Sequence, residues 1–349
     1  MRHLLAALVV SASSMGFISI AVAQNAQFRE PIPDTYTVVK GDTLWDISAT
    51  FLQNPWYWPE IWHVNTQIEN PHLIYPGDVL RLVFIDGQPR ITLDNSGRMQ
   101  KLEPKARIIS QGEAIPTISL DNINSFLSRS RIVSEEELKM APYVVQGSDN
   151  HLLVGAGDRV YIRNSGERDS VNVEQYAVYG IYRKGDKFRD PDTNEDLGIQ
   201  AIDIGSGKIQ RVNEEVATMA VERTTEEVRI GDRLLRQEER PIDSTFFPSA
   251  PKDNITGTII AVESGVNQVG DRSVVVINRG TREGMTPGNV LAIYKRGSTV
   301  RDQVRGGKVK LPDERAGLMM VFRSFEKVSL AIVLEASRGL SVNDIVTNP

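Results

Sequence analysis

The chain has 349 residues, and at about 150 residues per domain this length predicts about two or three domains. Hydrophobic residues make up 40% of the chain and charged residues 24%, which excludes collagen-like, wholly disordered and polytopic membrane classes. The net charge of −5 provides no basic surplus for neutralising phosphates, so no nucleic-acid partner is expected. The chain has no cysteine, and its four tryptophans all fall within residues 45–62.

Residues 1–23 have the pattern of a secretory signal peptide. Arg2 gives a positive start, residues 4–22 are mostly apolar, and Ala21-Val22-Ala23 is a small-residue cleavage site. The alternative is an uncleaved membrane anchor, for which the apolar run is short and weakly hydrophobic. No cysteine follows the cleavage site, which excludes a lipid anchor there. We therefore expect an exported, periplasmic protein with no transmembrane helix after cleavage, held together by its core without disulfides.

Residues 24–34 hold two prolines and no periodicity, and are predicted to be a linker. A compact module follows at residues 35–84 and opens with a short β-branched strand over 36–39. A helix is predicted over 43–52, because Thr43 and the aspartate three residues later have the spacing of a capping box and apolar residues recur at helical spacing.

Asn54-Pro55 ends this helix, and Pro59 suits the first turn of a second helix. A turn at Pro76-Gly77-Asp78 and a strand over 79–83 close the module. The predicted order is therefore strand, helix, helix, strand.

The run from Tyr36 to Ile47 (YTVVKGDTLWDI), continued by Asn70-Pro71-His72-Leu73-Ile74 and Pro76-Gly77-Asp78, closely resembles the LysM domain. The resemblance implies a βααβ fold that binds N-acetylglucosamine-containing glycans such as peptidoglycan and chitin. One signal peptide, one LysM module and a long β-rich remainder also resemble a group of poorly characterised Gram-negative envelope proteins. This looser resemblance implies no mechanism.

The resemblance places a glycan groove between the loop at 41–44 and the loop at 70–74. A neutral sugar polymer calls for main-chain donors and acceptors and small apolar contacts, and Gly41 lets the main chain approach closely. Other roles stay open: Asp42 and Thr43 as helix caps, Leu44 in the core, Asn70 in its own turn and His72 as an incidental surface residue. The predicted glycan-binding residues are Gly41, Asp42, Thr43, Leu44, Asn70, His72, Leu73 and Ile74.

The tryptophans of this module fall into two groups. Trp45 and Trp62 are expected in the core. Trp56, Tyr57 and Trp58 lie between the helices beside two prolines. Three roles are open for these residues: packing beneath the helices, docking on the following domain, or stacking on a sugar face. We favour packing or docking.

The remainder of the chain changes character. Residues 85–141 are predicted to be a mixed α/β connecting segment, with a short helix at 121–127 and a second helix opened by Ser134 that ends before Pro142. Beyond it strands and glycine turns dominate. We predict one β module over 142–237, a proline-rich linker over 238–254 and a second β module over 255–349.

The two β modules share a pattern. Tyr182-Arg183-Lys184-Gly185 and Tyr294-Lys295-Arg296-Gly297 are offset by 112 positions, and so are Gly231-Asp232 and Asn343-Asp344. This spacing predicts a tandem duplication, although two unrelated β segments with common Gly-Asp turns would look similar. The overall prediction is an α+β fold, with a βααβ module followed by mainly antiparallel small barrels or sandwiches.

Enzyme classes common at cell walls are largely excluded. Cysteine-dependent enzymes need a cysteine, and zinc sites need several histidines, whereas residues 84–349 hold only His151. The Ser324-x-x-Lys327 match lies in a predicted strand, where its two side chains point to opposite faces. The remainder has no tryptophan to line a sugar cleft, and its acidic residues are expected mostly in turns and on exposed faces.

We therefore expect a protein that is not an enzyme and needs no metal or cofactor. Its expected role is to bind peptidoglycan strands and to tether β modules that contact other envelope proteins or a second copy of the chain. The alternative is a lytic glycosidase targeted by the LysM module, because a glycosidase needs only two placed carboxylates.

Overall fold

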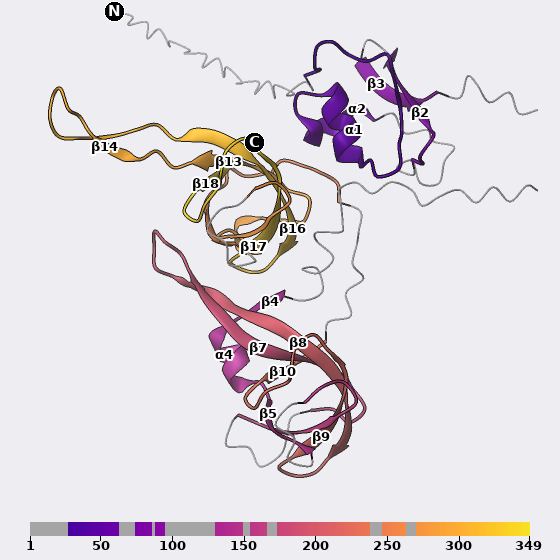
Figure 1. Cartoon of the computed structure of the whole chain (residues 1–349), viewed down its shortest axis with the longest axis vertical. Coiled ribbons are helices and arrows are strands. Elements are labelled where there is room, and N and C mark those ends of the chain that lie inside the picture. The colour runs from indigo at the N-terminus through magenta and orange to yellow at the C-terminus, as the bar shows by residue number, and fades with distance from the viewer. Residues whose placement is uncertain are drawn as a thin grey trace, which may run out of the picture.

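The structure is a computed structural model, and it describes residues 27–62, 74–85, 88–94, 130–148, 154–165, 173–237, 246–262 and 270–349. The predicted signal peptide, the helix predicted over 121–127 and the groove residues Asn70, His72 and Leu73 lie outside these ranges. No helix in the described part of the chain is long and apolar enough to cross a membrane. Figure 1 shows a small N-terminal module and two β-rich units.

The N-terminal module combines short helices with a three-stranded antiparallel sheet. The sheet has the order β1-β2-β3. In chain order the elements are β1 (Thr35–Thr37), α1 (Leu44–Phe51), the 3-10 helix η1 (Pro55–Tyr57), α2 (Trp58–Ile61), β2 (Val79–Ile85) and β3 (Gln88–Leu93).

Helix α1 forms where the apolar spacing predicts it. Leu44, Ile47 and Phe51 recur on one face and are each at most 2% exposed. Burial of each of these side chains contributes about 1.5–3 kcal/mol. The short α2 begins at Trp58, because the 3-10 turn η1 runs directly into it. Pro59 lies in its first turn, as predicted.

The third strand differs from the prediction, which assigned it to the connecting segment. Leu80 of β2 pairs with Tyr36 on one side and with Leu93 on the other. Ile91 is 1% exposed and forms a bridge with Trp62 at the end of α2. The strand adds to the module because β2 has a second edge and Ile91 completes the core.

The first β unit closes on itself. Strand β8 pairs with β7 over its first part and with β9 from Gly205 onward, so the order β8-β7-β10-β5-β6-β9 returns to its starting strand. We call this ring the first barrel. Its strands are β5 (Tyr143–Gly147), β6 (Arg159–Arg163), β7 (Val178–Arg189), β8 (Asp196–Val212), β9 (Ala217–Thr224) and β10 (Arg233–Arg236).

Two elements lie against the first barrel. Strand β4 (Ser130–Val133) pairs with β8, and helix α4 (Glu135–Met140) follows it. Ser134 caps α4, since its Oγ accepts from the amide of Glu137 at 3.0 Å, as the capping-box pattern predicts. The helix ends before Pro142, and its Leu138 is buried.

The second β unit is a closed six-stranded barrel with the order β11-β12-β17-β16-β13-β18. We call it the second barrel. A 3-10 helix η3 (Thr281–Glu283) follows β12, and a two-stranded hairpin of β14 (Thr299–Arg301) and β15 (Lys308–Lys310) lies between β13 and β16. The barrel strands are β11 (Thr256–Val262), β12 (Val274–Ile277), β13 (Val290–Lys295), β16 (Glu314–Ser324), β17 (Ser329–Ala336) and β18 (Ile345–Thr347).

The two barrels have the same strand order when their strands are matched in chain order. Val178 pairs with Lys208 in the first barrel, and Val290 pairs with Met320, each 112 positions later, in the second. The registers shift after Ile181 in one barrel and at the corresponding position in the other. The α+β class with antiparallel β units after an N-terminal module is therefore confirmed.

The barrel interiors match, whereas the exteriors differ. Ile181 and Ile293 occupy the same position and are both fully buried in their barrel cores. On the outer face, Lys208 is exposed but its counterpart Met320 is fully buried.

The buried outer face of the second barrel belongs to one apolar cluster that also contains the core of the N-terminal module. The ring of Trp58 lies 6.0 Å from that of Phe247, in the segment that leads into β11. Ser249, in the same segment, forms a bridge with Asn289 beside β13. Residues 246–254, predicted as linker, therefore pack against both the N-terminal module and the second barrel.

Each barrel carries one long hairpin, which we call an arm. The first arm, residues 184–201, is the far end of β7 and the start of β8. The second arm, residues 296–313, includes β14 and β15. In Figure 1 the second arm projects clear of both barrels, whereas the first arm rises from the first barrel toward the second.

Candidate functional site

The loop between β1 and α1 is a tight turn fixed by one carboxylate. Oδ2 of Asp42 accepts from the amide of Val39 at 2.8 Å and from the hydroxyl of Tyr36 at 3.0 Å. Gly41 adopts φ of +101°, a conformation that favours glycine. Burial raises the pKa of Tyr36, and its hydrogen bond to Asp42 raises that pKa further.

Thr43 is the N-cap of α1. Its Oγ1 accepts from the amide of Asp46 at 3.1 Å and donates to Oδ2 of Asp46 at 2.7 Å. The side chain is 5% exposed, so its hydroxyl serves the helix. The amides of Leu44 and Trp45 in the first turn have no intrahelical acceptor, since they precede the first i to i−4 bond.

A second turn of the same design lies beside the first. Oδ2 of Asp78 accepts from the amide of Tyr75 at 2.9 Å, and Gly77 has φ of +96°. Gly77 donates to the carbonyl of Val38 at 2.8 Å, and Val38 donates to Asp78 at 2.9 Å. These bonds hold the two turns side by side at one end of the sheet.

The structure places five of the eight predicted groove residues. Gly41 is exposed and Asp42 is partly buried. Leu44 and Ile74 are 2% and 0% exposed, so both residues belong to the core. Asn70, His72 and Leu73 lie outside the described residues.

The roles of Tyr36 and Tyr75 were not predicted: the hydroxyl of Tyr36 donates to Asp42, and the amide of Tyr75 donates to Asp78. The repeated Gly-Asp pair in Lys40-Gly41-Asp42 and Pro76-Gly77-Asp78 was the available signal.

The aromatic cluster between the helices is buried. Trp45 and Trp62 are each 8% exposed, as predicted for core residues. Trp56 and Trp58 are 6% and 1% exposed, and Tyr57 is 8% exposed with its ring 3.7 Å from that of Trp56. These rings pack beneath the helices and, through Trp58, against Phe247, rather than presenting a flat face to solvent.

The family profile described as the LysM domain matches residues 36–83. Residues 36–83 form a LysM domain. The LysM domain is a general peptidoglycan- and chitin-binding module.

The chain is also similar to the uncharacterized protein YqbP of Bacillus subtilis (strain 168). The two are 42% identical over 60 residues, which are 14% of this chain and 27% of the relative. The chain thus matches about a quarter of the length of this relative, and the likeness concerns a module rather than a whole protein.

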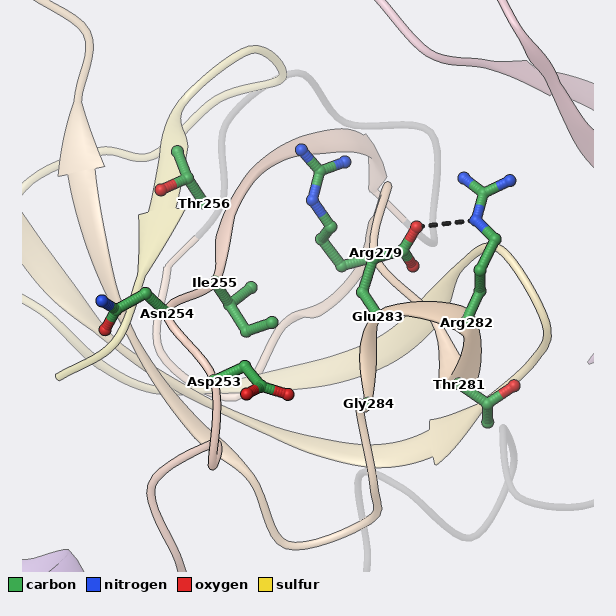
Figure 2. A pocket seen from close by; sticks show the side chains of 9 residues that line it. All are labelled: Asp253, Asn254, Ile255, Thr256, Arg279, Thr281, Arg282, Glu283 and Gly284. Carbon is green, nitrogen blue, oxygen red and sulfur yellow. Dashed lines mark hydrogen bonds and ion pairs between the residues drawn. The ribbon is translucent and has the colours of Figure 1, made fainter.

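A polar pocket lies where the second barrel begins, with a volume of about 700 Å³ (Figure 2). Nε of Arg282 donates to Oε1 of Glu283 at 2.8 Å, and Arg279 donates to the carbonyl of Asn278 at 2.7 Å. Arg282 and Glu283 are thus held by each other and Arg279 by the main chain, and we assign the pocket no ligand. The lining residues are Asp253, Asn254, Ile255, Thr256, Arg279, Thr281, Arg282, Glu283 and Gly284.

Acidic residues were expected mostly in turns and on exposed strand faces, and four aspartates of the barrels are buried, three of them beside turns. Asp190, Asp203, Asp232 and Asp344 are each at most 6% exposed. Each has a basic partner, as in the pair of Asp232 and Arg183 at 3.0 Å. Among the described residues no group of three His, Cys, Asp or Glu is placed to hold a metal ion.

Proposed function

We propose that this protein binds peptidoglycan strands through the groove of its LysM domain without cleaving them, and so tethers the two barrels to the wall in the periplasm. The observation that carries the proposal is the LysM domain at residues 36–83. Its exported location rests on the signal-peptide pattern of residues 1–23.

Main-chain groups carry recognition in the proposed groove. Leu44 and Ile74 are buried and Thr43 caps α1, which leaves the exposed turn at Gly41 to face the ligand. Acetamido and hydroxyl groups are neutral hydrogen-bonding partners, which suits such a surface. Asn70, His72 and Leu73 are proposed to form the opposite wall.

A single groove of this kind binds weakly. A handful of hydrogen bonds and a modest apolar contact must also offset the cost of association, so we expect a Kd between roughly 1 mM and 1 μM. A peptidoglycan layer offers many identical sites, so this affinity localises the protein when more than one copy is held together.

The pKa values of Glu135 and Glu195 are shifted in the direction opposite to that of a glycosidase's general acid. A general acid for glycoside cleavage needs a raised pKa. Instead, hydrogen bonds from Arg282 and Lys327 lower the pKa of Glu195 from 4.5 to about 2. Hydrogen bonds from Lys187 and Lys139 lower that of Glu135 from 4.5 to about 2.

We also infer that the two barrels derive from one ancestral barrel by tandem duplication. The matching strand order, registers and 112-position offset support this inference. A duplicated scaffold keeps its interior while its surfaces are free to acquire different partners.

Retention of the full chain on purified sacculi tests the proposed function. Thr43→Ala combined with Leu73→Ala should abolish retention, and soluble N-acetylglucosamine oligomers should compete with it. Thr43→Ser keeps the capping oxygen and should bind like the wild type. Circular dichroism of each variant establishes that it is folded.

Two outcomes would contradict the proposal. Undiminished retention of the folded double variant would remove the groove assignment. Release of soluble muropeptides from the sacculi by the purified protein would remove the non-catalytic assignment.

A further inference from the structure

The tips of the two arms have the same structure. Oδ1 of Asp190 accepts from the amides two and three residues later, both at 2.9 Å. Asp302, 112 positions later, does the same at 2.8 and 2.9 Å. Asn194 and Gly306 follow at the same place in each tip, with positive φ of 59° and 74°. The arms can therefore be compared residue by residue.

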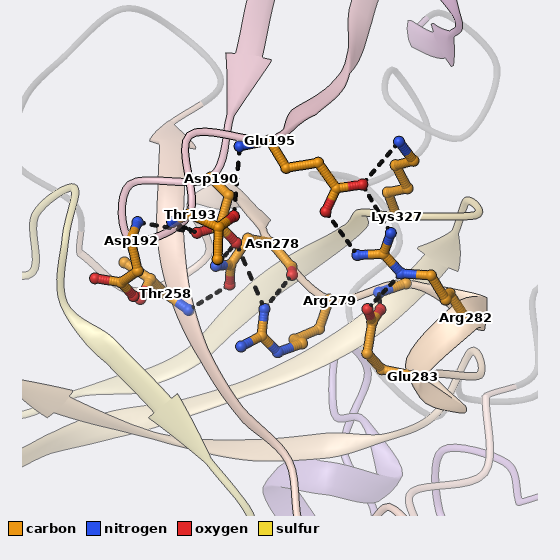
Figure 3. A network of polar contacts seen from close by, with 11 residues as sticks. Asp190, Asp192, Thr193, Glu195, Thr258, Asn278, Arg279, Arg282, Glu283 and Lys327 are labelled. Atoms are coloured by element: carbon orange, nitrogen blue, oxygen red, sulfur yellow. Dashed lines mark hydrogen bonds and ion pairs between the residues drawn. The ribbon is translucent and has the colours of Figure 1, made fainter.

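The tip of the first arm is docked on one end of the second barrel (Figure 3). Glu195 lies between two cations, with Nζ of Lys327 at 2.8 Å and Nη1 of Arg282 at 2.8 Å. Oδ2 of Asp190 accepts from Nδ2 of Asn278 at 2.7 Å. The residue Asp190 is only 6% exposed, because this contact covers it.

Apolar side chains accompany this polar contact. Phe188 and Leu197 lie on the two strands of the first arm, are 5% and 4% exposed, and belong to the cluster that includes the outer face of the second barrel. Their counterparts in the second arm are Val300 and Val309, which face each other in register. These valines are 40% and 46% exposed. The second arm thus exposes the pair that the first arm buries.

Charge also distinguishes the arms. The first arm has three basic and five acidic residues, whereas the second has five basic and two acidic residues. Arg189 pairs with Asp196 across the first arm at 3.1 Å. The same register in the second arm sets Arg301 opposite Lys308, and like charges in this position destabilise a hairpin. A negatively charged partner relieves that repulsion.

The first barrel has its own version of the end that holds the first arm. Ile162 pairs with Val144 as Ile277 pairs with Ile259, and the turn between β8 and β9 matches the turn between β16 and β17. The residues that correspond to Asn278, Arg279 and Lys327 are therefore Arg163, Asn164 and Glu215.

This end of the first barrel complements the second arm. Lys327 pairs with Glu195 and donates to the main-chain carbonyl of Asp196 at 3.1 Å. The counterpart of Lys327 is Glu215 and that of Asp196 is Lys308, so the same contact would bring Glu215 beside Lys308. Glu214 beside Glu215 is also exposed. The side chains of Arg163 and Glu215 are 55% and 66% exposed and form an ion pair at 3.5 Å. An ion pair this exposed contributes little free energy, so little is lost when a new partner replaces it.

We propose that the second arm docks on this end of the first barrel in another copy of the chain. Lys308 faces Glu215, and Asp302 faces Arg163 and Asn164, which repeats between molecules the contact that joins the two barrels within one. The contact is heterologous, since it joins two different surfaces. Copies therefore associate head to tail, into a ring where the rotation closes and into a filament where it does not.

Sedimentation velocity of the full chain over a concentration series tests this proposal. The wild type should self-associate, and more weakly as salt is raised. An arm variant, Arg301→Glu with Lys308→Glu, and a face variant, Glu214→Lys with Glu215→Lys, should each weaken association by about 10- to 100-fold. The matched control, Lys208→Glu with Arg211→Glu, makes the same charge change on an exposed strand face and should associate like the wild type.

Mixing gives the sharpest result. The native arm of the face variant complements the native face of the arm variant, and the charge-reversed arm also complements the charge-reversed face, so an equimolar mixture should recover the head-to-tail association that neither variant shows alone. A chain that carries all four substitutions should associate again, because both charges are exchanged.

Three results would overturn the proposal. The first is a wild type that remains a monomer at all concentrations. The second is association as strong in the arm and face variants as in the wild type. The third is arm-dependent binding of the monomer to vesicles containing an anionic phospholipid, which would assign the arm to a lipid surface instead.

Discussion

The two barrels are alike inside and unlike outside. Their interiors hold side chains of the same kind at matching positions, as with Ile181 and Ile293. On the outside, the exposed Lys208 corresponds to the fully buried Met320, and the 41% exposed Tyr161 corresponds to Val276 at 1%. The interior fixes which strands pair, while the outer face sets what each barrel packs against. The second barrel packs against the LysM domain and the first arm, whereas the first barrel packs against α4 and leaves Lys208 and Tyr161 of its outer face exposed.

The largest effect is expected where both barrels need glycine. A Cβ at Gly205 would lie 2.2 Å from the carbonyl oxygen of Arg223, and one at Gly317 would lie 2.1 Å from that of Glu335. Main-chain oxygens of paired strands cannot move aside, so Gly205→Ala and Gly317→Ala should each lower the free energy of unfolding by about 3–5 kcal/mol. Chemical denaturation measures both.

Gly155→Ala and Gly270→Ala are the controls, since no atom lies within 4 Å of a Cβ at either position. If Gly205→Ala had the unfolding free energy of the wild type while Gly317→Ala lost stability, the two barrels would be less alike than their registers indicate.

The arms are expected to differ in the next measurement. Phe188→Ala removes a ring that is 5% exposed and should cost about 3 kcal/mol of unfolding free energy. Val300→Ala, at the matching position in the second arm, should change it by less than about 0.5 kcal/mol, because that side chain is 40% exposed. Equal losses in thermal unfolding would contradict the contrast between a docked and a free arm.

A smaller difference is expected at the buried aspartate of each barrel. Asp232 accepts two bonds from Arg183 at 3.0 Å and one from the amide of Arg229 at 2.8 Å. Asp344 accepts from Nζ of Lys295 at 3.3 Å and from the amide of Ser341 at 2.8 Å.

Asp232→Ala should cost about 2 kcal/mol and Asp344→Ala about 1 kcal/mol, since the planar guanidinium makes the better paired contact and both cations are partly solvated. Urea denaturation measures the order of the two losses. A larger loss of unfolding free energy for Asp344→Ala would contradict the claim that the guanidinium of Arg183 makes the stronger contact.

The smallest effect is expected from pH at the docked arm. The pKa of Glu195 is lowered from 4.5 to about 2, so its contribution is complete above pH 4.5 and is lost as the pH falls toward 2. Melting temperatures of the wild type should therefore fall faster across this window than those of Glu195→Gln. Parallel pH profiles for the two proteins would contradict the assigned pairing with Lys327 and Arg282.

Local signals predicted the local structure. Thr43 and Ser134, each three residues before an acidic residue, mark the starts of α1 and α4, because capping depends only on neighbours in the chain. The 112-position offset between the two β units was visible in Gly231-Asp232 and Asn343-Asp344, which form turns of one design around a buried aspartate.

Contacts between distant segments could not be predicted in the same way. The pairing of β3 with β2 depends on the place left under Trp62, and the burial of Asp190 depends on Asn278 in another barrel. Within the groove, the resemblance indicated Leu44 and Ile74, but sequence spacing does not separate a core side chain from a groove wall. Only the structure shows that their side chains belong to the core.

The contact of Trp58 with Phe247 has a mechanical consequence. Under the proposed function, a glycan strand that pulls on the LysM domain also pulls on the segment that leads into the second barrel. That segment is held beside β13 by the bridge of Ser249 with Asn289 and by the close approach of Phe247 to Gly288, where a Cβ would lie 2.4 Å from the carbonyl oxygen of Phe247. Tension at the wall is thus shared between the chain itself and a packed side contact, so that the second barrel, rather than the intervening chain alone, resists it.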